Sequence, residues 1–430
     1  MEKNQKPVHE KPLPKLIYIT GLKKYNWLYR EGYTLNNMIL SKANEYRDDL
    51  IKFMQKLVRT KSYSSKEKDV IEVIRKEMEK IGFDEIRIDG LGSIVGKIGK
   101  GKTIIAMDSH IDTVEVGNED LWKVDPFGGE IKDGIIYGRG ASDQKGGMAA
   151  MVYGVKIMKE LDLLDDFTLY ITGTVMEEDC DGLCWQHLYN EENIRPDYVV
   201  ITEPTNLNIY RGHRGRTEFR VKTTGLSCHA SAPERGINAI YKMAKIINEI
   251  ERLNENLKDD PFLGKGTIAV SQIFFKSPSQ NAVPDECQIQ IDRRLTAGET
   301  QESAIGEIEN AIRKAGVEGE VIELFYERPA YTGKVYPTKK YYPTWVMDRE
   351  SEIVNKTVDC YREVFGEEPK VDKWTFSTNG VATCGMYKIP TVGFGPANEI
   401  YAHSPEDQIP VEHLVKAAAM YALLPKKLSS

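Results

Sequence analysis

The sequence predicts an α/β fold that carries a smaller, inserted α+β domain. Two observations support this prediction. Apolar runs such as TIIAM and YVVIT are typical of strands buried on both faces of a sheet, and the helix expected after Gly147 would provide a crossover between such strands. Between about residues 210 and 330 the order of strands and helices changes. The 430 residues are enough for two to three domains.

Two helices are expected before the first strand. The first begins near Ser41, and its apolar residues recur at helical spacing. They are Leu50, Phe53, Met54, Leu57 and Val58. The second helix opens with a capping box formed by Ser64 and Glu67 and ends at Gly82. Its apolar face consists of Val70, Ile71, Ile74, Met78 and Ile81. Strands are then expected near 93–98, 103–108, 167–174, 197–202 and 389–394.

The region 210–330 reads as a domain of its own. Its strands EFRVKTT, TIAVSQIFF, ECQIQIDRRL and EVIELFY and its two helices, 234–254 and 299–314, follow the order β-α-β-β-α-β. This order is that of a ferredoxin-like domain. We therefore divide the chain into a mobile tail, a catalytic domain and an inserted domain. The ranges are 1–15 for the tail, 16–209 and 331–430 for the catalytic domain, and 210–330 for the insert.

Composition narrows the function classes. The chain has 58 basic and 65 acidic residues, which give a net charge of −7 and argue against nucleic acid as the main partner. No stretch approaches the ~20 apolar residues that a membrane span needs, and the N-terminus has no apolar signal segment. Six scattered cysteines form no disulfide framework. We therefore expect a cytoplasmic protein without membrane partners.

Metal-type side chains follow several of the predicted strands. In open α/β sheets the functional site lies beyond the carboxyl ends of the strands, so residues far apart in sequence are expected to converge there. Two histidines and three carboxylates as ligands, with two more carboxylates in support, are typical of a site for two hydrolytic metal ions. The residues are His110, Asp112, Asp143, Glu177, Glu178, Glu203 and His403.

Local chemistry suggests a role for several of them. A ligating histidine needs its second ring nitrogen held, and Asp112, two residues after His110, suits that task. Asp143 lies in a Gly-rich turn that opens a helix, from which its carboxylate can bridge two cations. The adjacent Glu177 and Glu178 would repel each other without cations. We assign Glu178 to the metal and Glu177 to general base catalysis on a bridging water.

With these motifs in order, residues 45–425 resemble the M20 metallopeptidases, a family with two co-catalytic zinc ions. The resemblance implies a zinc-exopeptidase-like catalytic domain, with a mixed sheet flanked by helices, and a ferredoxin-like lid that usually forms a homodimer. It also implies two ligand sets. The sets are His110, Asp143 and Glu203 for one metal, and Asp143, Glu178 and His403 for the other. Zn²⁺ is expected, with Mn²⁺ or Co²⁺ as alternatives that these ligands do not exclude.

The insert carries further segments similar to the family. In GLSCHASAPERGINAI, the resemblance implies that His229 reaches a neighbouring active site and stabilises the oxyanion. In QNAVPDECQIQIDRR, it implies that Asn281 and Arg294 bind a substrate carboxylate or carbonyl, and the fork of Arg294 suits a carboxylate. Within the family, the chain looks closest to hydrolases linked to selenium metabolism. The implied reaction is hydrolysis of an amide bond in a small peptide or an N-acyl amino acid.

Three alternatives remain beside this hypothesis. An N-carbamoyl amino acid amidohydrolase is the nearest rival chemistry. A non-catalytic, metal-stabilised binding protein would have no need of a base such as Glu177. Residues 96–103, GKIGKGKT, match the phosphate-binding loop pattern, which requires a helix to begin at its Lys-Thr end. Because Thr103 opens an apolar run typical of a strand, we interpret this match as a decoy.

Overall fold

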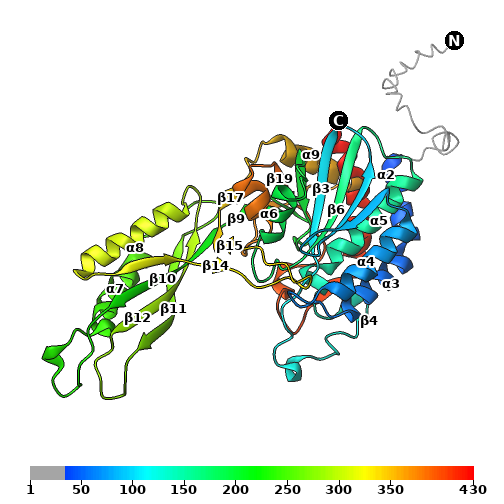
Figure 1. Ribbon diagram of the computed structural model, residues 1–430. Helices are drawn as coiled ribbons and strands as arrows, with labels where there is room; N and C mark the ends of the chain where they lie inside the picture. The colour runs from blue at the N-terminus through cyan, green and yellow to red at the C-terminus, as the bar shows by residue number, and fades with distance from the viewer. Residues whose placement is uncertain (1–33) are drawn as a thin grey trace, which may run out of the picture.

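The computed structural model describes residues 34–430. A central sheet of eight strands organises the larger part of the chain, as can be followed in Figure 1. The order is β1-β2-β6-β3-β7-β19-β8-β18. Strands β3, β6, β7 and β19 run parallel to their neighbours in this group, whereas β2 pairs antiparallel with β1 and β6. The strands are β1 (Glu85–Ile88), β2 (Ile94–Gly99), β3 (Thr103–His110), β6 (Phe167–Thr174), β7 (Tyr198–Ile201), β8 (Ile209–Tyr210), β18 (Val371–Asp372) and β19 (Thr391–Gly393). The tail predicted at 1–15 lies outside the described residues.

Helices cover both faces of this sheet. One layer packs on the larger apolar cluster, which includes Ile105 and Met107 of β3. It consists of α2 (Leu35–Glu45), α3 (Arg47–Arg59), α4 (Lys68–Ile81), α5 (Gly146–Glu160), α9 (Glu352–Phe365) and α10 (Val411–Ser429). On the opposite face, α6 (Leu183–Asn190) packs on a second cluster that includes Ala106. A mixed sheet between helices confirms the predicted fold class.

The start of the chain differs from the prediction in two ways. Instead of one helix from Ser41, α2 begins at Leu35, because Thr34 accepts a hydrogen bond from the Asn37 amide, and the helix is interrupted at Tyr46 before α3. The capping box is also wrong. Helix α4 begins only at Lys68 and has no side-chain cap. The predicted end of α4 at Gly82, which adopts a left-handed conformation, is confirmed.

A second sheet has the order β11-β12-β10-β13, with all neighbours antiparallel. Together with two helices it gives the β-α-β-β-α-β succession of a ferredoxin-like unit, as predicted. The elements are β10 (Gly215–Thr224), α7 (Ala239–Glu255), β11 (Thr267–Lys276), β12 (Glu286–Leu295), α8 (Gln301–Ala315) and β13 (Glu320–Glu323). In Figure 1 this unit, which we call the insert, projects away from the main sheet. Its exact boundaries at 210 and 330 stay a prediction.

Short strands complete the fold. The strand β16 (Tyr341–Tyr342) joins the start of β10, and two small pairs connect the insert with the rest. The pairs are β9 (Gly212–His213) with β17 (Trp345–Val346), and β14 (Phe325–Tyr326) with β15 (Thr338–Lys339). A three-stranded sheet contains β4 (Glu130–Lys132), β5 (Ile135–Tyr137) and β20 (Gln408–Pro410).

Two other expectations concern the phosphate-loop match and the cysteines. Thr103 opens strand β3 rather than a helix, so the phosphate-loop match at 96–103 lacks the helix that nucleotide binding requires. All six cysteines are free. Within residues 34–430, no helix has the length and apolar character to cross a membrane.

The first turn of α5 needs a residue without a side chain. A Cβ atom at Gly147 would lie 2.2 Å from the Thr202 hydroxyl, just past the end of β7. We expect Gly147→Ala to lower the free energy of unfolding by about 1–3 kcal/mol, because this contact leaves no space for a methyl group. Urea unfolding, monitored by circular dichroism, measures this change in the free energy of unfolding. The matched control is Gly306→Ala in α8, where nothing lies within 4 Å of the added carbon. It should stabilise the protein by about 0.5–1 kcal/mol, and equal effects of the two substitutions would contradict the prediction.

Candidate metal centre

The predicted ligands gather at one edge of the central sheet. His110 is the last residue of β3, Glu177 and Glu178 follow β6, and Glu203 follows β7. Because these three strands are parallel neighbours, their carboxyl ends meet at the same edge. Asp143 comes from the turn Ala141–Lys145, directly before α5, and its own backbone is extended rather than helical, with φ −122° and ψ 97°. His403 comes from the segment after β19.

The side chains form two groups that could each hold a metal ion. In the first, the Nε2 atom of His110 lies 2.9 Å from Asp143 Oδ1 and 3.5 Å from Glu203 Oε1. In the second, the Nε2 atom of His403 lies 2.8 Å from Glu178 Oε2 and 3.3 Å from Asp143 Oδ2. Asp143 therefore presents one carboxylate oxygen to each group. The two groups have the same members as the two ligand sets that the family resemblance implied.

Burial and charge at this edge fit bound cations. Glu177 Oε1 and Glu203 Oε2 are buried and have no hydrogen-bond partner among the described residues, an arrangement that is costly unless something else compensates it. Burial, together with neighbouring carboxylates, raises the pKa of both residues well above the usual value. Burial and the charge of Asp143 likewise raise the pKa of Glu178 to about 7. Divalent cations would supply the positive charge that these carboxylates lack, so the residues present fit the ions.

Asp112 supports the site in more ways than the sequence suggested. His110 Nδ1 lies 3.0 Å from the Asp112 backbone carbonyl and 3.5 Å from its carboxylate. The carboxylate accepts hydrogen bonds from the hydroxyl of Ser64 at 2.7 Å and from the backbone amides of Glu177 and Glu178 at 3.2 and 3.1 Å. Asp112 therefore orients both the histidine and the loop that follows β6. Ser64, expected to cap a helix, holds this carboxylate instead.

A buried aspartate that the sequence reading missed holds the turn around Asp143. Asp407 accepts hydrogen bonds from the amides of Gly140 and Ser142, both at 2.7 Å, and from the guanidinium of Arg139 at 3.0 Å. These contacts fix the backbone from which the Asp143 carboxylate projects. The signal was present in YAHSPEDQ, where Asp407 stands four residues after His403. Nothing local in that segment indicates a partner some 265 residues earlier.

The loop after β6 is also held from the side of the insert. Asp179, the residue after Glu178, accepts hydrogen bonds from the Tyr326 hydroxyl and from the Arg328 guanidinium, both at 2.7 Å. Asp181 lies 3.6 Å from the guanidinium of Arg216 at the start of β10. The segments that enter and leave the insert therefore both contact the loop that carries Glu177 and Glu178.

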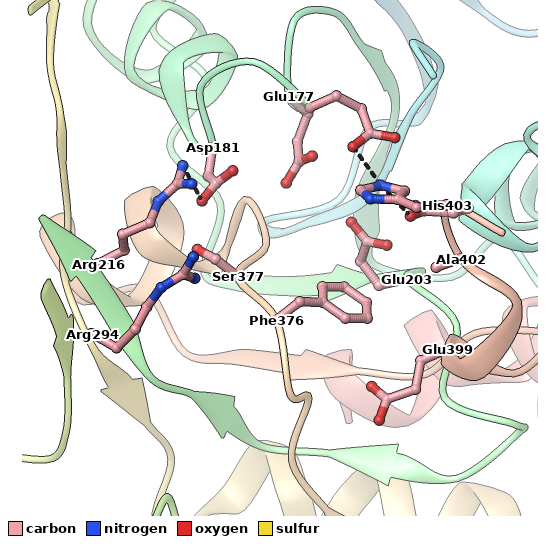
Figure 2. Close-up of a pocket in the computed structure, with 12 residues that line it drawn as sticks. Glu177, Asp181, Glu203, Arg216, Arg294, Phe376, Ser377, Glu399, Ala402 and His403 are labelled. Atoms are coloured by element: carbon pink, nitrogen blue, oxygen red, sulfur yellow. Dashed lines mark hydrogen bonds and ion pairs between the residues drawn. The ribbon is translucent and has the colours of Figure 1, made fainter. Parts of the chain in front are cut away.

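A cavity of about 280 Å³ opens beside the two ligand groups (Figure 2). Its lining comprises Asp143, Glu177, Glu178, Asp181, Glu203, Arg216, Arg294, Phe376, Ser377, Glu399, Ala402 and His403. Arg294 thus shares a cavity with members of the ligand groups, although its fork pairs with Asp292 at 2.8 and 3.2 Å. His229 and Asn281 are exposed, lie beside each other on the insert and are absent from this lining. The structure does not bring them to the ligands of the same chain.

Comparison with known proteins agrees with this architecture. Residues 106–427 match the model of peptidase family M20/M25/M40. The uncharacterized protein YgeY of Escherichia coli (strain K12) is 51% identical over 391 residues, which cover 90% of this chain and 96% of that protein. A probable succinyl-diaminopimelate desuccinylase of Staphylococcus aureus (strain Mu50 / ATCC 700699) is 31% identical over 229 residues, which cover 47% of this chain and 56% of that protein.

Solved structures show the same fold. Aminopeptidase PepT from Bacillus cereus ATCC 10987 has a TM-score of 0.68 at 22% identity and covers 89% of this chain and 99% of its own. The YXEP protein of Bacillus subtilis, a dinuclear metal binding peptidase from the M20 family, has a TM-score of 0.64 at 15% identity, with coverages of 89% and 98%. The fold and the site define a metal-binding hydrolase. The chain belongs to peptidase family M20/M25/M40.

The unpaired oxygen of Glu203 leads to a prediction about metal removal. In the metal-free protein, Glu203→Gln should raise the free energy of unfolding by about 1–3 kcal/mol, because it removes a buried carboxylate that has too few partners. In contrast, added Zn²⁺ should stabilise the wild type much more than this variant. Thermal unfolding with chelator and with Zn²⁺ measures both effects. The control is Glu318→Gln, at a side chain that is 95% exposed and should change stability by less than about 0.5 kcal/mol. Equal stabilisation of wild type and Glu203→Gln by Zn²⁺ would remove Glu203 from the ligand set.

Proposed function

We propose that the protein is a dinuclear metal-dependent hydrolase that cleaves an amide bond in a small peptide or an N-acyl amino acid. The observation that carries this proposal is the shared carboxylate of Asp143, which faces His110 through one oxygen and His403 through the other. Two ligand groups joined in this way are what a pair of co-catalytic ions requires. The chain's membership of a family of metal-dependent peptidases and desuccinylases supports the same reaction class.

Each ligand group would hold one divalent cation. His110, Asp143 and Glu203 would bind the first, and Asp143, Glu178 and His403 the second. The nitrogen and oxygen donors suit Zn²⁺, and Mn²⁺ or Co²⁺ are the alternatives. When bound, the ions would polarise the scissile carbonyl and lower the pKa of water.

Glu177 is the residue that we assign to proton transfer. It lines the cavity, belongs to neither ligand group, and its Oε2 atom lies 3.9 Å from His110 Nε2. Its other oxygen has no hydrogen-bond partner among the described residues and is therefore free to meet a water molecule. Glu177 would accept a proton from the attacking water and deliver it to the leaving amine.

The size of the cavity supports a small substrate. A volume of about 280 Å³ is at the lower end of ligand sites, so a dipeptide or a short N-acyl amino acid is favoured over a long peptide. An N-carbamoyl amino acid presents the same kind of carbonyl and stays the nearest alternative. Release of amino acid from dipeptides and from N-acetyl, N-succinyl and N-carbamoyl amino acids, each assayed with metal-loaded enzyme, separates these classes.

In a homodimer, the insert of one chain would complete the active site of the other chain. Strand β11 lies at the edge of its sheet, and it exposes Ile273, Phe274 and Phe275 to solvent. An exposed apolar edge strand is a ready surface for pairing with another chain. In a homodimer formed through this surface, His229 of the partner would stabilise the oxyanion of the tetrahedral intermediate. The exposure of His229, away from the cavity of its own chain, supports this arrangement.

The role of Glu177 is tested by replacing its carboxylate with a neutral amide of the same size. Glu177→Gln should keep both metal ions but lose about 10²–10⁴-fold in kcat, the usual size of a general-base effect. The matched variant is Glu178→Gln on the neighbouring residue, which should lose bound metal as well as turnover. Elemental analysis and steady-state kinetics together distinguish the two outcomes. If Glu177→Gln turns over substrate at the wild-type rate, the assignment is wrong.

Catalysis by the partner's histidine is tested by mixing two inactive variants. A Glu177→Gln chain keeps His229, and a His229→Ala chain keeps the base, so each heterodimer would contain one complete site. With random exchange of equal amounts, half of the dimers are mixed, and about a quarter of the wild-type activity should return. The control is each variant incubated alone, which should recover nothing. Lack of recovery after subunit exchange has been verified, for example by mass spectrometry, would contradict action between subunits.

A further inference from the structure

Two arginines stand opposite each other in the wall of the cavity. Arg216 of β10 and Arg294 of β12 are direct partners in the antiparallel pairing of these strands. Directly opposed residues project from the same face of a sheet, about 4.5–5.5 Å apart at Cβ, and like charges in such a pair are destabilising. Both side chains line the cavity, and Figure 2 shows them entering it from the same side. An anion between the two guanidinium groups would relieve this repulsion.

The guanidinium of Arg216 retains unused donors. Its nearest carboxylates, Asp181 at 3.6 Å and Glu218 at 3.9 Å, lie beyond hydrogen-bond distance. Its Nε atom is buried and has no hydrogen-bond partner within the described chain. The group is held instead by packing, since it lies 4.4 Å from the ring centre of Tyr342. Arg216 is thus positioned without being neutralised by a bidentate partner, whereas Arg294 has one in Asp292.

The surroundings favour a ligand with an anionic end. Apart from the arginines, the ionisable groups of the lining are six carboxyl groups and His403. In Figure 2, Glu203 and His403 of the ligand groups lie across the cavity from Arg216. A substrate that spans the cavity would place its scissile carbonyl near the ligand groups and its other end near the arginines. The fork of Arg216 matches the planar oxygens of a carboxylate, and Arg294, whose Nε and Nη2 groups bond Asp292, can add its Nη1 group.

We propose that Arg216 is a further specificity-determining residue, which adds a second guanidinium to the substrate-carboxylate site that the family resemblance implies for Arg294. The proposal rests on the hydrolase function proposed above. The carboxylate has two sources in this substrate class. It is either the α-carboxylate of the leaving amino acid or the terminal carboxylate of a dicarboxylic acyl group. Neutral amides of the same size would bind poorly in both cases.

The test uses four related substrates and three variants of the full-length, zinc-loaded enzyme. The substrates are N-acetyl-L-alanine, N-succinyl-L-alanine and the C-terminal amides of both, and acyl release gives kcat/KM. Arg216→Gln removes the charge, and Arg216→Lys keeps charge and stem but loses the fork, which guards against a folding defect in the first variant. Arg220→Gln is the matched control, because Arg220 lies on the same strand outside the cavity lining. Thermal unfolding verifies that each variant is folded.

In Arg216→Gln, we expect kcat/KM for the preferred carboxylate substrate to fall about 10–100-fold, the effect of losing a charged hydrogen bond, while its neutral counterpart changes less than about 3-fold. Arg216→Lys should fall between wild type and Arg216→Gln, and Arg220→Gln should resemble wild type. If Arg216→Gln abolishes the preference in kcat/KM for a C-terminal acid over its amide, the subsite binds the α-carboxylate. If it abolishes the preference for a succinyl over an acetyl substrate, the subsite binds the carboxylate of the acyl group. Equal losses on all four substrates would mean that Arg216 only supports the fold, and would overturn the proposal.

A binding measurement separates this proposal from the hydrolase function. N-succinyl-L-alanine is titrated calorimetrically into the zinc-loaded Glu177→Gln protein, with and without Arg216→Gln or Arg220→Gln. A loss of at least about 10-fold in affinity with Arg216→Gln, but not with Arg220→Gln, supports the subsite even if none of the four substrates is cleaved. Equal affinity in all three proteins, or no binding in any of them, overturns it.

Discussion

Concentration of negative charge at the carboxyl ends of β3, β6 and β7 is the constraint on which the rest of the site depends. Buried carboxylates repel each other and are costly to desolvate, so they persist only where the backbone holds them and cations can neutralise them. Asp407 fixes the turn of Asp143 through two amides, and Asp112 fixes the loop of Glu177 and Glu178 through two others. The backbone of the site is therefore preorganised by aspartates that are themselves fully hydrogen-bonded.

The same loop is the mechanical link between the ligand groups and the insert. Glu178 reaches the second ligand group, while the next residue, Asp179, is held by Tyr326 and Arg328 from the segment that leaves the insert. A change in the position of the insert would pull on the backbone next to a ligand. Closure of a domain over substrate and assembly of the reacting groups would then be one event rather than two, which is a common way to exclude water from hydrolytic sites.

Much of the fold and the set of candidate ligands could be predicted from the sequence, because both depend on local patterns, whereas the division into two ligand sets was implied by the family resemblance. Apolar runs identify strands buried on both faces, and polar residues at their ends must meet at one edge. The supporting contacts could not be predicted in the same way. Ser64 and Glu67 match a helix cap in sequence, yet Ser64 binds Asp112 instead, since a buried carboxylate competes more strongly for its hydroxyl than a solvated helix end. The roles of Asp407 and Arg216 depend on residues far away in the chain, so no local pattern indicates them.

Charge balance connects the arginine pair with the candidate metal centre. Six carboxyl groups, two arginines and His403 line the cavity. With every carboxyl group ionised and His403 neutral, the lining carries a formal charge of −4. Two divalent ions would bring the formal charge of this lining to zero. On the proposed function, a substrate with a carboxylate would therefore be favoured by the metal-loaded cavity, where Arg216 and Arg294 are no longer outweighed by the carboxylates. The arginines would give this anion a defined position away from the cations, and its carboxylate would then not compete with the scissile carbonyl for them. The same interaction would then recognise the substrate and keep its carboxylate away from the metal ions.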